Sequence, residues 1–117
     1  MKKFFLLLGT ILLTACSSQS LPPVNYVITV TGIPGSGYSA SYQINSGAEV
    51  AIPASLPQTI NLAGQPAGTA VSARVTLTRQ GNVVLTITAN GEVCESGNAV
   101  NTLGAGQTAQ TSISCTR

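Results

Sequence analysis

Along most of the chain, apolar and polar residues alternate with a period of two, which places successive side chains on opposite faces of a β-strand. The apolar members of the alternating segments are Tyr26, Ile28 and Val30; Tyr38, Ala40, Tyr42 and Ile44; Val71, Ala73, Val75 and Leu77; Leu85 and Ile87; and Ile113 and Cys115. No segment beyond residue 23 has the apolar spacing of an amphipathic helix. The pattern predicts an all-β domain over residues 24–117, a small antiparallel β-sandwich of seven to eight strands with an immunoglobulin-like or transthyretin-like arrangement.

Turn residues separate these segments. Glycine-rich or asparagine-rich stretches at Gly32–Gly37 and Asn45–Gly47 predict turns. The prolines at positions 53, 57 and 66 indicate loops or edge strands, because proline cannot donate a hydrogen bond to a ladder. Asn90-Gly91 suits a two-residue type I′ hairpin, since both central residues need a positive φ. Such a turn would place Ile87 opposite Cys94 and direct Cys94 into the core.

The segment after Leu77 predicts a second hairpin. A three-residue loop, Gln80–Asn82, would pair Leu77 with Leu85 and keep one face of the hairpin apolar. The same register would pair Val75 with Ile87. A two-residue loop would instead place apolar side chains against polar ones, so the longer loop is expected.

The first sixteen residues have the features of an export signal. Lys2 and Lys3 are followed by an apolar run of ten residues, Phe4–Leu13, which fits a signal-peptide core and is too short for a bilayer span. Leu13-Thr14-Ala15-Cys16 resembles the lipobox of bacterial lipoproteins, in which the cysteine thiol receives a lipid before the signal is cleaved. We expect residues 1–15 to be the signal peptide and residues 16–23 to be a lipidated Cys16 with a flexible tether.

The lipobox interpretation implies a location. Acyl chains on Cys16 would hold the domain at a membrane, because each buried methylene contributes about 0.8 kcal/mol. By resemblance to Gram-negative sorting rules, Ser17 after the cysteine favours the outer membrane over other parts of the cell envelope. An uncleaved anchor, or ordinary secretion with a chance cysteine, is the alternative.

Charge is scarce beyond the signal. Three arginines (Arg74, Arg79 and Arg117) balance three glutamates (Glu49, Glu92 and Glu95), so the net charge of +2 of the whole chain comes from Lys2 and Lys3. Without a basic patch to neutralise phosphates, no nucleic-acid partner is expected.

The chain has three cysteines, of which the lipid would consume Cys16. An oxidising envelope favours a disulfide between Cys94 and Cys115, and closing a loop of about twenty residues would stabilise the fold by about 3 kcal/mol. Two free, buried thiols are the alternative. We expect no metal site and no cofactor, because two cysteines without His or Asp cannot supply four ligands.

Catalysis has few candidate residues. The absence of His and Asp rules out Ser-His-Asp and Cys-His arrangements, so we expect no enzyme. Glu92 and Glu95 could form a carboxylate pair but read better as solvated hairpin charges, and Gly32–Gly37 lacks the Lys and helix of a phosphate loop. The three tyrosines (Tyr26, Tyr38 and Tyr42) could line a pocket, although alternating aromatics usually belong to a core.

Five segments of the chain resemble the MmpS family, namely Tyr26–Gly32, Ala40–Tyr42, Ser55–Thr59, Leu85–Gly91 and Ser112–Cys115. Members of that family are small mycobacterial membrane proteins with an extracytoplasmic β-sandwich, and they assist large exporters of lipids and siderophores. The resemblance implies the same fold and an accessory role in transport.

The chain departs from the family at three places. It has a lipobox where the family has a transmembrane helix, and Gln58 where the family typically has Trp. The family's first cysteine falls at Leu85, which by the expected register lies diagonally beside Cys94 on the core face.

These observations favour a lipid-anchored, non-enzymatic contact module that binds an envelope protein, with a carrier of a small apolar ligand between the sheets as the alternative. Recognition would use polar sheet faces or an exposed strand edge. Because the Val24–Thr31 strand follows the tether, we expect it to be that edge, with Thr29 as a contact residue.

Overall fold

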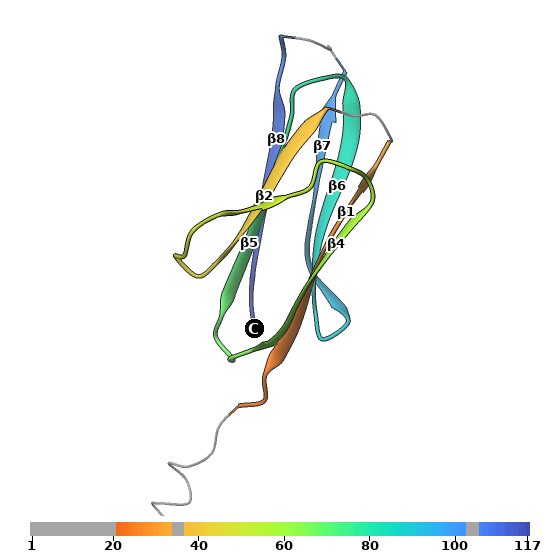
Figure 1. The fold of residues 1–117 in the computed structure, drawn as a ribbon. Helices are drawn as coiled ribbons and strands as arrows, with labels where there is room; N and C mark the ends of the chain where they lie inside the picture. The colour runs from red at the N-terminus through yellow and green to blue at the C-terminus, as the bar shows by residue number, and fades with distance from the viewer. Residues whose placement is uncertain (1–20, 34–36, 103–105) are drawn as a thin grey trace, which may run out of the picture.

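The computed structural model describes residues 21–33, 37–102 and 106–117, and within these ranges the chain forms strands and no helix (Figure 1). The eight strands of the described part are β1 (Val24–Gly32), β2 (Tyr38–Ile44), β3 (Val50–Ile52), β4 (Gln58–Gln65), β5 (Ala70–Leu77), β6 (Gly81–Ala89), β7 (Glu92–Asn101) and β8 (Ala109–Thr116). They form two antiparallel four-stranded sheets, in the orders β4-β1-β6-β7 and β3-β2-β5-β8. The predicted all-β sandwich is confirmed, and its strand order differs from that of immunoglobulin domains, where the first strand pairs with the second.

The core lies between the two sheets and takes most of the inward residues that the alternation predicted, while Ala40, Tyr42 and Ile44 are only partly buried. Its fully buried members are Tyr26, Ile28, Val30, Val71, Val75, Leu77, Val83, Leu85 and Ile87. They come from β1 and β6, the central strands of the first sheet, and from β5, one of the two central strands of the second. Tyr38 and Ile52 extend the core at the side. The core is therefore mainly aliphatic, with Tyr26, Tyr38 and Cys115 also buried in it.

The predicted β5–β6 hairpin is wrong. Leu77 pairs with Tyr38 and Ala109 in the second sheet, whereas Leu85 pairs with Val30 and Gly97 in the first. Residues 78–80 carry the chain from one sheet to the other. The apolar faces of β5 and β6 meet across the core. The same alternation of apolar and polar residues therefore fits two strands in facing sheets as well as two strands of one hairpin.

The Asn90-Gly91 hairpin is confirmed, with φ angles of 50° and 84° and Ala89 opposite Glu92. The pairing of Ile87 with Cys94 is wrong, because a β-bulge places Ile87 opposite Glu95 and leaves Cys94 as the extra residue. Cys94 still packs against the core, although it is only partly buried. The bulge also sets Leu85 opposite Gly97, one residue further from Cys94 than the expected diagonal position.

The expectation that β1 is an edge strand is wrong. β1 pairs with β4 on one side and with β6 on the other, and Thr29 lies between Thr59 and Thr86. The edges of the first sheet are β7 and β4, and the ends of β4 are marked by Pro57 and Pro66, as the proline rule predicts. The described chain therefore enters the sandwich through a central strand of a sheet.

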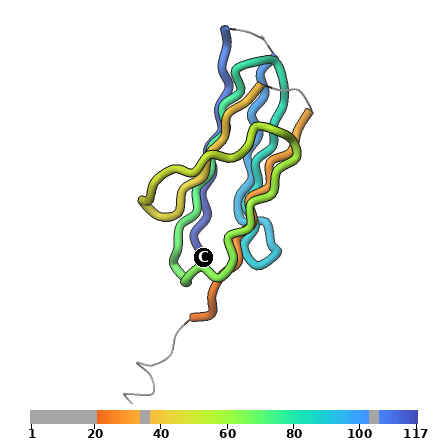
Figure 2. The backbone as a smooth tube through the Cα atoms, viewed as in Figure 1, coloured from red at the N-terminus to blue at the C-terminus, as the bar shows by residue number. Residues whose placement is uncertain are grey.

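A buried hydroxyl fastens the end of the sandwich at which the chain enters. The Tyr26 hydroxyl donates a hydrogen bond to the Thr69 carbonyl at 2.8 Å and accepts one from the Arg117 N–H at 2.9 Å. The Gly68 N–H donates to the Arg117 carbonyl at 2.7 Å. One fully buried side chain thus joins β1, the β4–β5 turn and the end of the chain, which lie together in Figure 2.

Cys94 on β7 and Cys115 on β8 lie at disulfide distance, with 5.9 Å between their Cα atoms. The two strands belong to different sheets and are edges on the same flank of the sandwich. The bridge therefore joins the sheets to each other on that flank and closes a sequence separation of 21 residues.

Removing the bridge is expected to destabilise the fold by about 2–5 kcal/mol in the Cys94→Ala/Cys115→Ala variant, because the unfolded chain gains loop entropy. Urea unfolding of both proteins measures the difference, and reductant should lower the stability of the wild type by a similar amount. Quantitative thiol labelling of unreduced, unfolded protein at Cys94 and Cys115 would show that the bridge is absent.

The Tyr38 hydroxyl holds the β3–β4 connection by donating to the carbonyls of Pro53 at 3.0 Å and Ser55 at 3.3 Å. Its side chain is buried, and desolvation raises the pKa of the hydroxyl above its usual value of 10.0. The folded state therefore keeps this proton to a higher pH than the unfolded state does.

From this shift we expect an alkaline loss of stability. The contribution of Tyr38 is fully present below about pH 10 and is lost as the pH rises through the folded-state pKa. Urea midpoints between about pH 8 and 11 should fall more steeply for the wild type than for Tyr38→Phe, with Tyr42→Phe as the control. Parallel curves for Tyr38→Phe and the wild type would contradict this assignment.

Candidate functional site

The outer face of the second sheet is polar over three adjacent strands. Its outward residues are Ser39, Ser41 and Gln43 on β2, Ser72, Arg74 and Thr76 on β5, and Gln110, Ser112 and Ser114 on β8. They alternate along each strand with the apolar residues that point into the core. The register aligns them in cross-strand rows, of which Ser41, Arg74 and Ser112 form the middle one.

This face is hollowed over its middle row. An open hollow of about 250 Å³ is lined mainly by polar residues, among them Ser41, Glu49, Arg74 and Ser112. A second hollow of about 420 Å³ adjoins it and shares Ser41, Glu49 and Arg74. Both hollows lie on the outside of the sandwich, so a ligand there would meet hydroxyl, amide and charged groups.

The rim of the hollow is the β2–β3 loop, which projects from the side of the sandwich in Figure 2. Asn45 fixes its base, since its N–H donates to the Ala70 carbonyl at 2.7 Å and its side-chain oxygen accepts from the Ala70 N–H at 2.9 Å. Asn45 has a φ of 54°, in the left-handed region that asparagine tolerates. The Gln43 amide donates to the Gly47 carbonyl at 2.6 Å and draws the tip of the loop toward β2.

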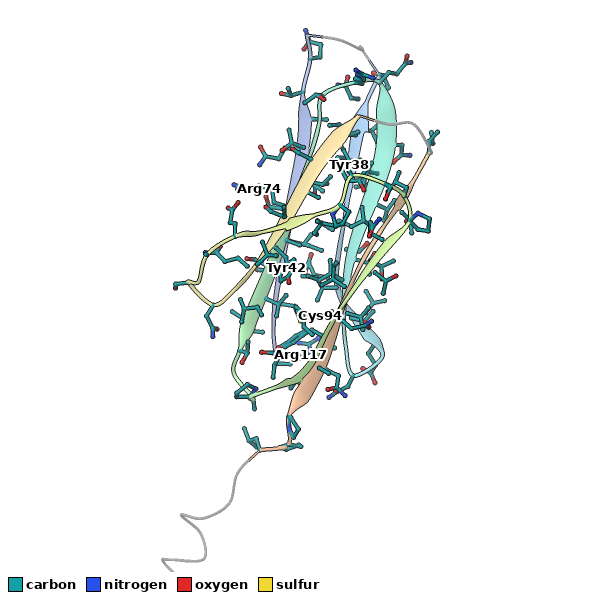
Figure 3. The ribbon with its side chains drawn as sticks, viewed as in Figure 1. Tyr38, Tyr42, Arg74, Cys94 and Arg117 are labelled. Atoms are coloured by element: carbon teal, nitrogen blue, oxygen red, sulfur yellow. A yellow bond between two sulfur atoms is a disulfide. The ribbon has the colours of Figure 1, made fainter. Side chains whose placement is uncertain are left out.

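The loop brings Glu49 to Arg74 in the middle of the face. One carboxylate oxygen of Glu49 forms an ion pair with Nη2 of Arg74, and the other accepts a hydrogen bond from the Ser41 hydroxyl at 3.2 Å. Figure 3 places Arg74 on the outer side of the sandwich. Both charged side chains are 47% exposed, so the pair contributes about 0–1 kcal/mol to stability.

Chemically, the hollow is suited to binding a polar group. The guanidinium of Arg74 has more N–H donors than one carboxylate oxygen engages, and the surrounding serines can each donate and accept. A ligand with carboxylate, carbonyl or hydroxyl oxygens can therefore be held without separating Arg74 from Glu49.

The tyrosines separate into two groups. Tyr26 and Tyr38 are buried in the core, as alternating aromatics usually are, while Tyr42 is only partly buried and borders the hollow. The space between the sheets is occupied by the fully buried side chains of the core.

The other predicted residues either lie apart from the hollow or lie outside the described residues. Cys16, with the whole of residues 1–20, lies outside the described residues. Glu92 and Glu95 are exposed on β7, in the other sheet. Of the Gly32–Gly37 turn, residues 34–36 lie outside the described part, and Gly32 ends β1.

The sequence pattern shows Glu49 and Arg74 as charges but does not show that they meet. They are 25 residues apart and meet only because β5 pairs with β2 and the loop folds back. The available signal was an arginine at a polar position within a strand otherwise free of charge.

Within the described ranges, no group of three metal-ligating side chains comes together. The same residues contain no helix that is long and apolar enough to cross a membrane. No protein-family model matches the chain, and no curated protein matches its sequence.

Proposed function

We propose that this protein is a lipid-anchored contact module of the cell envelope that binds a partner protein without catalysis and assists an envelope transport complex. The polar hollow around Arg74 and Glu49 supports this proposal most directly, because it is a pre-formed polar surface on a rigid sheet. The partner would present carbonyl, carboxylate or hydroxyl oxygens to Arg74 and to the serines beside it.

The composition of the chain favours contact over chemistry. The sequence contains no His, and its acidic residues are three glutamates, of which Glu49 is engaged with Arg74 and Ser41. A surface with a single ion pair among hydroxyl and amide groups would bind by directional hydrogen bonds, with little long-range attraction. We therefore expect modest affinity that depends weakly on salt.

The geometry of the entry point is compatible with a tether at Cys16. Leu21 is 76% exposed and Pro22 and Pro23 are exposed, so the chain approaches β1 from outside one end of the sandwich (Figure 1). The hollow faces sideways from this axis. A tethered domain would thus present it to a neighbour standing beside it on the same membrane.

A ligand carrier has less support. Such a carrier needs a space between its sheets, where this protein has closely packed aliphatic side chains. Both described hollows lie on the outer face.

The Arg74→Gln variant is expected to capture the partner from detergent-solubilised envelopes roughly tenfold less efficiently, because a charge-assisted contact is lost. Its stability should change by less than about 1 kcal/mol, since the ion pair is half exposed. Arg79→Gln is the matched control, because it removes the same charge from the β5–β6 connection, outside the hollow. Equal capture by both variants would refute the role of the hollow.

The Cys16→Ser variant is expected to lose membrane attachment, because serine cannot form the thioether to lipid. Intact mass spectrometry of membrane-extracted wild type should give a chain that begins at Cys16 and carries acyl mass. If Cys16→Ser is processed and fractionates with membranes like the wild type, the anchor assignment is wrong.

A further inference from the structure

The two flanks of the sandwich differ. On one flank, β7 and β8 lie close together and are joined by the bridge between Cys94 and Cys115. On the other flank, β4 is the edge of the first sheet and pairs only with β1 within the described residues, while β3 on the facing sheet is three residues long. The second flank is therefore open along β4.

Apolar side chains on the open flank are incompletely covered. Ile60 and Leu62 of β4, with Ala40 and Tyr42 of β2, pack against the core but are only partly buried, whereas their neighbours in β1 are fully buried. The inner face of β4 consequently retains apolar surface that one more strand would cover. Covering it is favourable by about 25 cal/mol for each Å² removed from water.

Residues 58–62 of β4 lack the features that usually keep an edge strand from pairing with another chain. Natural edge strands are usually blunted by charge, proline, a bulge or shortness. On β4 the irregularity falls near its end, where Gly64 has a φ of 69° and donates its N–H to the Asn25 side chain at 2.8 Å. Residues 58–62 precede it, pair regularly with β1, and contain neither charge nor proline.

We propose that β4 pairs with β4 of a second copy of this chain through residues 60–62, antiparallel about a twofold axis at Asn61. The sequence of the segment is self-complementary in this register, because Ile60 would face Leu62 of the partner subunit on the inner side. Asn61 would face Asn61 of the partner subunit on the outer side. The two first sheets would then form one continuous sheet, and the uncharged edges bring no repulsion.

A cysteine placed at Asn61 tests the register in the full-length chain. Residues directly opposite in an antiparallel pair have Cα atoms about 4.5–5.5 Å apart, which a disulfide can span. The Asn61→Cys protein should therefore run as a covalent dimer on a non-reducing gel. Asn98→Cys, on the exposed outer face of β7 in the same sheet, is the matched control and should remain a monomer.

The Asn61→Lys variant tests the interface without a new bond. Like charges directly opposite each other destabilise a strand pair, so the mass by light scattering should fall by half relative to the wild type. Asn98→Lys should keep the dimer mass and melt as the wild type does, because its position is exposed. Asn61→Lys should melt as a folded monomer, at a lower temperature than the dimer, because association stabilises the folded state.

Equal cross-linking of Asn61→Cys and Asn98→Cys, or a wild type of monomer mass, would overturn the proposal. A covalent product of Asn61→Cys whose mass differs from twice the chain would also overturn it, because a different protein would then occupy the edge. The dimer does not depend on the contact function, so Arg74→Gln should leave the cross-link unchanged.

Discussion

The burial of alternate side chains between two sheets is the interaction on which the rest of this molecule depends. Within the described residues, the apolar positions of β1, β5 and β6 fill the interior, and the single aromatic ring that is fully buried there, Tyr26, uses its hydroxyl to fasten the end of the chain. This packing is complete in the middle of the sandwich and thins toward its flanks. A covalent bridge reinforces one flank, and the other keeps a free strand edge.

The same alternation places every second residue on the outer face of a sheet, outside the core. On the outer face of the second sheet those residues are small and polar, which leaves room for a loop to fold back and set Glu49 against Arg74. Because the sheet below is fixed by its core, the hollow is formed before any ligand arrives. A small domain with little charge can in this way offer a defined binding surface at low energetic cost.

The sequence predicted which side chains point into the core, but apart from the Asn90-Gly91 hairpin it did not predict which strands pair with each other. Alternation located five of the strands, since these depend on local pattern alone. The expected hairpin turn gave the inward direction of Cys94 but not its pairing. It misassigned Leu77 and Leu85 to one hairpin, because inward residues look the same whether their strands lie in one sheet or in opposite sheets. The bulge at Cys94 and the meeting of Glu49 with Arg74 depend on long-range pairing, which short patterns do not encode.

The central position of β1 has a mechanical consequence. The chain enters the domain through a strand that is hydrogen-bonded on both sides, to β4 and to β6. A pull along the entering chain acts parallel to both ladders and loads the hydrogen bonds of two strand pairs, whereas at an edge strand it would load those of one. A force applied to the chain ahead of β1 is thus resisted by two strand pairs at once.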